Sequence, residues 1–216
     1  MNITKKLCMI FAAIMTAATV WVFLSCGADA MENVSERRSG FFSASDDAFT
    51  ITVVSGVREK TYEADGKAGE LKPYTLVTVA PKEFDVDAIY TFTAKTKKGE
   101  FGGTLTVHPF AASFSAEFDS ETTGAFTIEI KGGGTAREYS PTSLVTKDMI
   151  SYRQAIEAAG KALKLPEGQH EVRVRMIENP IGGEGLCWHV AYYYKDGKDY
   201  GVLIDPTSAK ALAVKK

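Results

Sequence analysis

A cysteine and a histidine two positions apart, Cys187 and His189, are the pair in this sequence that could do covalent chemistry. Side chains at i and i+2 of a strand point to the same side of a sheet, so the thiol and the imidazole could form a nucleophile with its base. No third residue that would orient the histidine can be named from the sequence. We therefore favour a simpler interpretation, a small buried cysteine beside a hydrogen-bonded histidine.

The other candidates for catalysis or metal binding are isolated. His108 and His170 have no partner at the spacing of metal ligands, and no HExxH motif occurs. Asp85 and Asp87 could share a strand face, but Ca²⁺ needs about six oxygen ligands and no loop gathers them. The glycine run 132–134 lacks the lysine of a phosphate-binding loop, and no GxGxxG or GxSxG motif is present. We predict that the protein is not an enzyme and uses no cofactor or metal.

Aromatic rings are concentrated around the strand that holds Cys187. Rings on a solvent-facing sheet serve as recognition platforms for peptides or sugars, which makes Trp188, Tyr193 and Tyr200 the predicted binding residues. Strand alternation sends Trp188, Tyr192 and Tyr194 to one face and Tyr193 to the other. The favoured alternative is that the first three pack beneath a helix, which leaves Tyr193 as the exposed ring.

The segment that must position these residues is predicted to be a small α+β module over residues 146–216, with one helix on an antiparallel sheet. Ser151 and Gln154 have the spacing of a capping box at a helix start, and Pro166 stops that helix. Alternating residues then predict strands over 172–176, 186–194 and 200–204, with a last short strand at 211–214. Asp196-Gly197 predicts a tight hairpin turn between the second and third of these strands.

This pattern of a capped alanine-rich helix, a strand, Trp188-His189-Val190 and then Val202-Leu203-Ile204-Asp205 resembles the PepSY-type domain over about residues 149–216. Domains of that family occur in exported bacterial proteins and in the propeptides of thermolysin-like peptidases. The resemblance implies a helix packed on an antiparallel sheet and a role in restraining peptidases or in binding at the cell envelope. It implies no catalytic residues.

The central segment, residues 46–140, is predicted to be an all-β domain. Its apolar residues recur at every second position, which is the pattern of half-buried strands, and short polar loops ending in glycine separate them. Six to eight strands without intervening helices favour an antiparallel β-sandwich, an Ig-like arrangement being one form of it and an open barrel the alternative. The strands are indicated by Phe49, Ile51, Val53, Tyr74, Leu76, Tyr90, Phe92, Leu105, Val107, Phe114, Ala116, Phe118, Phe126, Ile128 and Ile130.

The first 45 residues are predicted to serve export and attachment. Residues 1–30 resemble a bacterial signal peptide, with Lys5 and Lys6 before an uncharged apolar run. Its end allows two outcomes: a lipobox in which Cys26 is acylated, or cleavage after Ala30. The first gives a lipid-anchored envelope protein and the second a secreted one. Residues 31–45 show no periodicity and are predicted to be a flexible tether.

The charge balance limits the partners that can be expected. Lys and Arg number 25 against 27 Asp and Glu, a net charge of -2, which gives no electrostatic reason to expect nucleic acid or an anionic membrane surface. We therefore predict an exported, non-catalytic protein of the cell envelope that binds a peptide or protein, a peptidase being one candidate. The alternative is adhesion or carbohydrate binding by the β-sandwich, with the C-terminal module as a spacer.

Overall fold

The structure is a computed structural model, which describes residue 31 and residues 33–63 and 65–216. The predicted signal peptide and the acylation of Cys26 lie outside the described residues. The described chain is mostly β, with one helix. Its elements are β1 (Val34–Ser45), β2 (Phe49–Glu59), β3 (Leu71–Pro81), β4 (Tyr90–Thr96), β5 (Gly99–Val107), β6 (Phe114–Phe118), β7 (Thr127–Gly132), β8 (Thr135–Tyr139), β9 (Thr142–Ser143), α3 (Tyr152–Ala162), β10 (His170–Glu178), β11 (Leu186–Tyr194), β12 (Asp199–Ile204) and β13 (Ala211–Lys215).

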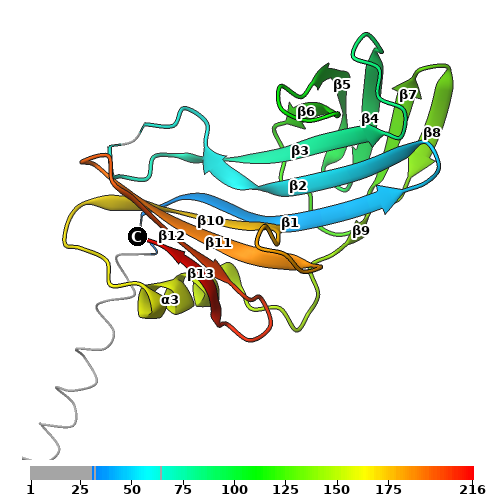
Figure 1. Ribbon diagram of the computed structural model, residues 1–216. Coiled ribbons are helices and arrows are strands. Elements are labelled where there is room, and N and C mark those ends of the chain that lie inside the picture. Colours follow the sequence, from blue (N-terminus) through cyan, green and yellow to red (C-terminus); the bar gives the residue numbers. More distant parts are fainter. Residues whose placement is uncertain (1–30, 32, 64) are drawn as a thin grey trace, which may run out of the picture.

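The strands form one large open mixed sheet in the order β13-β12-β11-β10-β1-β2-β3-β6-β5-β4-β7-β8, with β9 paired to β1. Neighbouring strands are antiparallel except for β1 and β10, which run parallel. Figure 1 shows α3 with β10–β13 at one end of the molecule and β4–β8 at the other, while β1, β2 and β3 run between them. The sheet is therefore continuous across the boundary that the sequence predicts between two modules.

The segment predicted to be a flexible tether forms β1, so that prediction is wrong. β1 pairs with β2 on one side and with β10 on the other, and Phe41 and Phe42 in it are buried. Two bulges, between Val34 and Glu36 and between Arg38 and Gly40, shift the register of the strand. A bulge interrupts the alternation of apolar and polar positions, so the strand shows no period in the sequence.

Two hydrophobic clusters stabilise the two ends of the sheet. Strand β5 pairs with β6 only near Thr106 and Val107, and there the sheet folds back, so that residues of β4 and β7 pack against those of β2 and β3. This cluster contains Phe42, Phe49, Ile51, Val53, Val77, Val79, Tyr90, Phe92, Ala94, Leu105, Phe114, Phe118, Phe126, Ile128, Ile130 and Tyr139. It includes most of the alternating residues from which the central strands are predicted.

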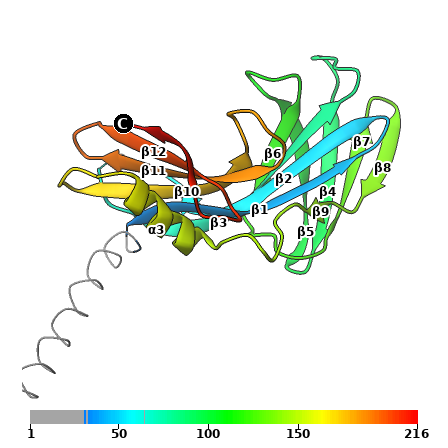
Figure 2. The ribbon, with the colours of Figure 1, turned by 60° about the horizontal axis from the view of Figure 1, so that its bottom comes forward.

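The second cluster forms where α3 covers one face of β10–β12 (Figure 2). Helix α3 begins with the predicted capping box: Ser151 Oγ accepts from the backbone of Gln154, whose side chain accepts from the backbone N–H of Ser151 at 2.9 Å. The alternation in β10 and β11 sends the larger apolar side chains towards the helix. The cluster includes Ala155, Ile156, Ala159, Leu163, Val172, Val174, Met176, Trp188, Val190, Tyr192, Tyr194, Val202 and Ile204.

The hairpin between β11 and β12 has the predicted turn. The backbone N–H of Tyr194 donates to the carbonyl of Lys198 at 2.9 Å, and Gly197 has a φ of 84°. Residues other than glycine adopt such a positive φ only at a cost, so the glycine fixes this turn and with it the β11–β12 register.

Candidate functional site

Trp188, one of the three predicted binding residues, lies inside the protein. Its side chain is 2% exposed, and its Nε1–H donates to the carbonyl of Ile150 at 3.0 Å. Trp188 shares its cluster with Ala155 and Ile156 of α3. The prediction of Trp188 as a binding residue is therefore wrong, and the alternative that it packs beneath the helix is confirmed.

The other two predicted rings lie on opposite faces of the sheet. Tyr200 packs on the helix side, edge to face with Tyr194 at a centroid distance of 5.4 Å. Tyr193 lies on the other face, where the guanidinium of Arg173 is 4.8 Å from its ring centroid and 3.4 Å from that of Tyr62. Tyr193 thus has an intramolecular cation–π partner, and the three aromatic residues do not form one recognition surface.

The environment of Cys187 and His189 disfavours nucleophilic chemistry. Cys187 is fully buried, and this burial raises the pKa of its thiol to about 11. Burial also lowers the pKa of His189, and the nearby charges of Arg175 and Arg38 lower it further. A reactive cysteine needs a low thiol pKa beside a cationic imidazole, so both shifts oppose that arrangement.

The isolated polar residues have local structural partners. Asp85 and Asp87 lie in the loop between β3 and β4, not on a strand face, and Asp85 Oδ1 accepts from the backbone N–H of Asp87 at 3.0 Å. His108 Nδ1 accepts from the backbone N–H of Phe110 at 3.2 Å, and the ring of His170 stacks on Tyr194. Among the residues the structure describes, no three His, Cys, Asp or Glu side chains gather as metal ligands would.

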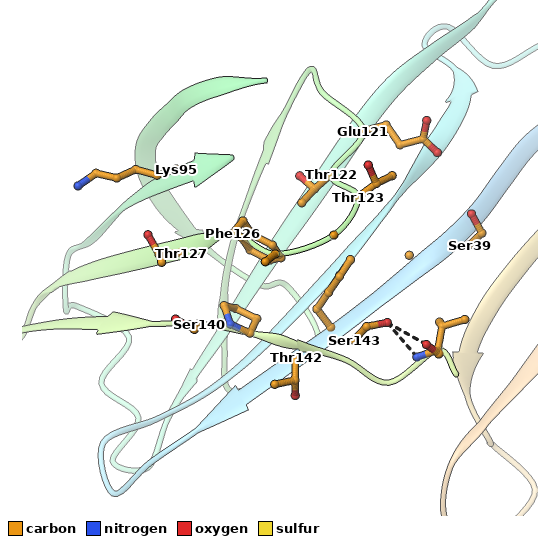
Figure 3. A pocket seen from close by; sticks show the side chains of 16 residues that line it. Ser39, Lys95, Glu121, Thr122, Thr123, Phe126, Thr127, Ser140, Thr142 and Ser143 are labelled. Carbon is orange, nitrogen blue, oxygen red and sulfur yellow. Dashed lines mark hydrogen bonds between the residues drawn. The ribbon is translucent and has the colours of Figure 1, made fainter. Parts of the chain in front are cut away.

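A groove of about 980 Å³ lies beside the middle of β1 (Figure 3). Most of its lining comes from three segments that are distant in sequence: β1, the stretch from β6 into β7, and the stretch that leads through β9 towards α3. Lys95 of β4 completes it. Its lining is made mostly of small and hydroxyl-bearing residues. They are Ser39, Gly40, Phe42, Lys95, Glu121, Thr122, Thr123, Gly124, Ala125, Phe126, Thr127, Ser140, Pro141, Thr142, Ser143 and Val145.

The floor of the groove is aromatic. The rings of Phe42 and Phe126 meet edge to face with their centroids 5.2 Å apart, and both side chains are almost fully buried. This geometry is a preferred one for aromatic pairs and holds the two rings in place. Figure 3 shows hydroxyls of Thr122 and Thr123 on one side of Phe126 and those of Ser140 and Ser143 on the other. An apolar floor with hydroxyl groups along its sides can take an apolar side chain and hydrogen-bond the chain that carries it.

One wall of the groove is fixed by buried hydrogen bonds. The backbone N–H of Thr122 donates to Ser55 Oγ at 2.7 Å, and Thr75 Oγ1 donates to the carbonyl of Ser120 at 2.6 Å. At the surface, Arg37 Nη2 lies 3.1 Å from Glu121 Oε1, which ties this wall to β1. The wall is therefore preorganised, because the groups that hold it belong to the sheet beneath.

The other wall is fixed to β1 by its backbone. β9 pairs with β1 at Phe42 and Ser43, and the backbone N–H of Leu144 donates to the carbonyl of Phe41 at 2.9 Å. The hydroxyl of Ser143 donates to the carbonyl of Val145 at 3.1 Å and accepts from the backbone N–H of the same residue at 3.2 Å.

The groove could not be predicted from the sequence, because each contributing segment looks like an ordinary polar loop. The only local signal is the concentration of small residues at 122–125 and 140–143.

Comparisons with known proteins identify no relative of this chain. The sequence matches no known protein family, and no curated protein or solved structure is similar to it. In the part of the chain that the structure describes, no helix has both the length and the apolar character needed to span a membrane.

Proposed function

We propose that this protein is a non-catalytic binding protein of the bacterial cell envelope, and that it holds an extended segment of a peptide or protein in the groove beside β1. The observation that carries the proposal is the groove itself, with the Phe42–Phe126 floor and hydroxyl-bearing walls. Such a surface suits a peptide, whose apolar side chain would cover the rings while its backbone meets the hydroxyls. Both walls are held by the sheet, so little order has to be created on binding.

We also propose how the protein is exported and built. Residues 1–30 act as a signal peptide, and acylation of Cys26 anchors the chain, although cleavage after Ala30 would instead release it. The folded-back strands β2–β8 act as a sandwich domain, and α3 with β10–β13 acts as a PepSY-like module. The partner within this proposal is a peptide or protein at the envelope, with a peptidase as the first candidate.

The groove is tested by blocking it. Ala125 is exposed and lines the groove, so Ala125→Trp places a bulky side chain there while both rings of the aromatic floor stay unsubstituted. Ala136 in β8 is exposed and is not among the groove-lining residues, so Ala136→Trp is the matched control. We expect a random 12-residue library, selected on the wild-type protein with Ala125→Trp used for counter-selection, to yield peptides that bind Ala136→Trp as they bind the wild type and bind Ala125→Trp at least tenfold more weakly. If the selection yields no peptide with this preference, the groove is excluded as a peptide-binding site.

The anchor and the peptidase partner have tests of their own. Intact-mass spectrometry of the native protein should show a diacylated or triacylated chain that begins at Cys26, whereas a chain that begins at Met31 would show release.

Co-secreted peptidases should be bound or inhibited by the wild-type protein and not by Ala125→Trp. If no such peptidase is bound or inhibited, the peptidase version is lost while peptide binding by the groove can still stand.

A further inference from the structure

Several of the most exposed large apolar side chains of the described residues lie in two loops. Ile89 is 73% exposed in the loop 82–89 between β3 and β4, and Phe110 is 93% exposed in the loop 108–113 between β5 and β6. Phe84 and Val86 in the first loop, and Val107 beside the second, are also exposed. Apolar residues gathered in this way on a protein surface mark an interaction site more often than scattered ones do.

The two loops lie side by side at one end of the sheet, and we call them the distal tip. Phe114 connects them, because it pairs with Val79 near the end of β3 and with Val107 at the end of β5. The ring of Phe84 lies against that of Phe114, with centroids 5.5 Å apart. The apolar side chains of both loops therefore belong to one surface.

The loops of the distal tip are held by local hydrogen bonds. In the first loop, Asp85 accepts from the backbone N–H of Asp87 through its side chain and from that of Ala88 through its carbonyl, at 3.0 and 3.2 Å. In the second, the backbone N–H of His108 donates to the carbonyl of Ser113 at 2.8 Å. A preordered loop loses little conformational entropy on binding, which favours its use as a docking surface.

The charges around the apolar side chains are mainly negative. Glu83, Asp85 and Asp87 alternate with Phe84 and Val86 along the first loop. The adjoining β1–β2 turn adds Asp46 and Asp47, which share the single guanidinium of Arg137. Lys82 is the one cation in the two loops. This surface repels an anionic bilayer and complements a partner whose apolar residues are flanked by Lys or Arg.

The position of the distal tip also favours a protein over a membrane. The backbone N–H of Lys82 donates to the carbonyl of Ala48, so the tip lies next to the turn that follows β1. β1 has 12 residues, which places this turn about 35 Å from the start of the strand. If the chain is anchored through Cys26, as proposed above, the tip points away from the bilayer. The charge argument does not depend on that anchor.

We propose that the distal tip is a second interaction surface, which docks a basic and apolar segment of a partner protein. The exposed ring of Phe110 and the aliphatic side chain of Ile89 would provide the apolar contact. The carboxylates of Glu83, Asp85 and Asp87 would select for Lys and Arg around it.

The test is selection from a phage-displayed random 12-residue library on the full chain, with the double variant Ile89→Ser/Phe110→Ser used for counter-selection. We expect the enriched peptides to combine Leu, Phe or Trp with at least two Lys or Arg. Their affinity should fall at least tenfold for the double variant and for Glu83→Lys/Asp85→Lys/Asp87→Lys. Leu212→Ser/Val214→Ser, which changes two exposed apolar residues of β13, is the matched control and should bind as wild type does.

Other results would overturn the proposal. Enriched peptides without basic residues, or equal binding by the wild type and the charge-reversed variant, would remove the proposed specificity. Flotation with phosphatidylglycerol or phosphatidylcholine vesicles that depends on Ile89 and Phe110 would show that the tip binds membranes. Binding to a glycan array with the same dependence would show that it binds carbohydrate.

The groove-blocking variant Ala125→Trp should retain binding at the tip, which separates this proposal from that for the groove. Equal unfolding temperatures of all variants would show that they are folded.

Discussion

Glu36 and Arg175, 139 positions apart in sequence, form an ion pair across the parallel pairing of β1 and β10. The Nε–H of Arg175 donates to Glu36 Oε2 at 2.8 Å, and the hydroxyl of Tyr74 in β3 donates to the other oxygen at 2.7 Å. The carboxylate of Glu36 is nearly buried, while Arg175 stays partly exposed. Burial alone would raise the pKa of Glu36, but the charge and hydrogen bonds of Arg175, with the bond from Tyr74, lower it below its ordinary value. One polar residue of β1 thus links β10, its neighbour on one side, to β3, which lies two strands away on the other side.

Removal of Arg175 should leave the carboxylate of Glu36 without its cation. We expect Arg175→Met to reduce the free energy of unfolding by about 2 kcal/mol, less than for a fully buried pair because solvent still reaches this site. The double variant Glu36→Gln/Arg175→Met should regain at least half of the loss, because no unpaired charge remains. Urea unfolding measures both effects. Lys198→Met, which breaks the exposed Asp196–Lys198 pair, is the control and should change little. A double variant no more stable than Arg175→Met would contradict this account.

The stability of the protein should depend on pH in the acid range. Backbone and hydroxyl hydrogen bonds from Ser208 and Thr207 lower the pKa of Asp205 to about 2, and bonds from the backbone of Phe49 and Ala48 do the same for Asp46. A carboxyl group with a lowered folded-state pKa stabilises the fold above its unfolded-state pKa, and this contribution is lost as the pH falls through the folded value. We expect constant stability from pH 7 to about pH 5 and a loss between about pH 4 and pH 2.

The variant Asp205→Asn checks the assignment of this acid transition. It should be less stable than the wild type at pH 7, and the difference should disappear near pH 2, where Asp205 becomes protonated. Urea midpoints at successive pH values give the comparison. Asp119→Asn, which affects only the exposed contact with Lys60, should show a small difference at every pH. A gap between Asp205→Asn and wild type that persists at pH 2 would show that the effect is steric.

Local sequence signals predict the parts of this fold that depend on short-range interactions. The capping box at Ser151, the hairpin at Gly197 and the alternating strands are all present, because each is fixed by residues within a few positions of one another. β1 could not be predicted in the same way. Its bulges remove the alternation, and Glu36 finds its partner 139 positions away, so its polar residues resemble those of a linker.

In the candidate sites, too, only the features that depend on nearby residues could be predicted. The sequence indicates that Trp188 can pack beneath α3, because side chains alternate between the two faces of β11 and the helix has small residues on one side. Arg173 lies over Tyr62 as well as over Tyr193, and Tyr62 comes from the loop between β2 and β3, far away in the sequence. The groove needs the fold-back at β5 before Phe42 and Phe126 can meet. Contacts between distant segments leave no pattern in a single sequence, so these features require the structure.

Cys187 should be unreactive in the folded protein. Burial raises the pKa of its thiol to about 11, so the thiolate at pH 8 is about a hundredfold scarcer than for an unperturbed cysteine. In a chain that has lost residues 1–30, or carries an acylated Cys26, Cys187 is the one free thiol. We expect its reaction with a disulfide reagent to be at least a hundredfold slower in buffer than in concentrated guanidinium chloride. Rapid labelling of the native protein would show that the thiol is accessible and would restore the Cys187–His189 nucleophile to consideration.

Trp188 should act as a structural residue and as a reporter of folding. In a chain without residues 1–30 it is the sole tryptophan, so its fluorescence should be blue-shifted in the native state and should shift to the red on unfolding. Trp188→Phe removes the hydrogen bond to Ile150 and part of the packing against α3, which should cost about 2 kcal/mol in the free energy of unfolding. Circular dichroism in urea measures this loss without the tryptophan signal. Tyr193→Phe, which keeps the ring beside Arg173, is the control and should unfold close to wild type. If Trp188→Phe were as stable as the wild type but failed to bind peptides that the wild type binds, Trp188 would have to be reinstated as a binding residue.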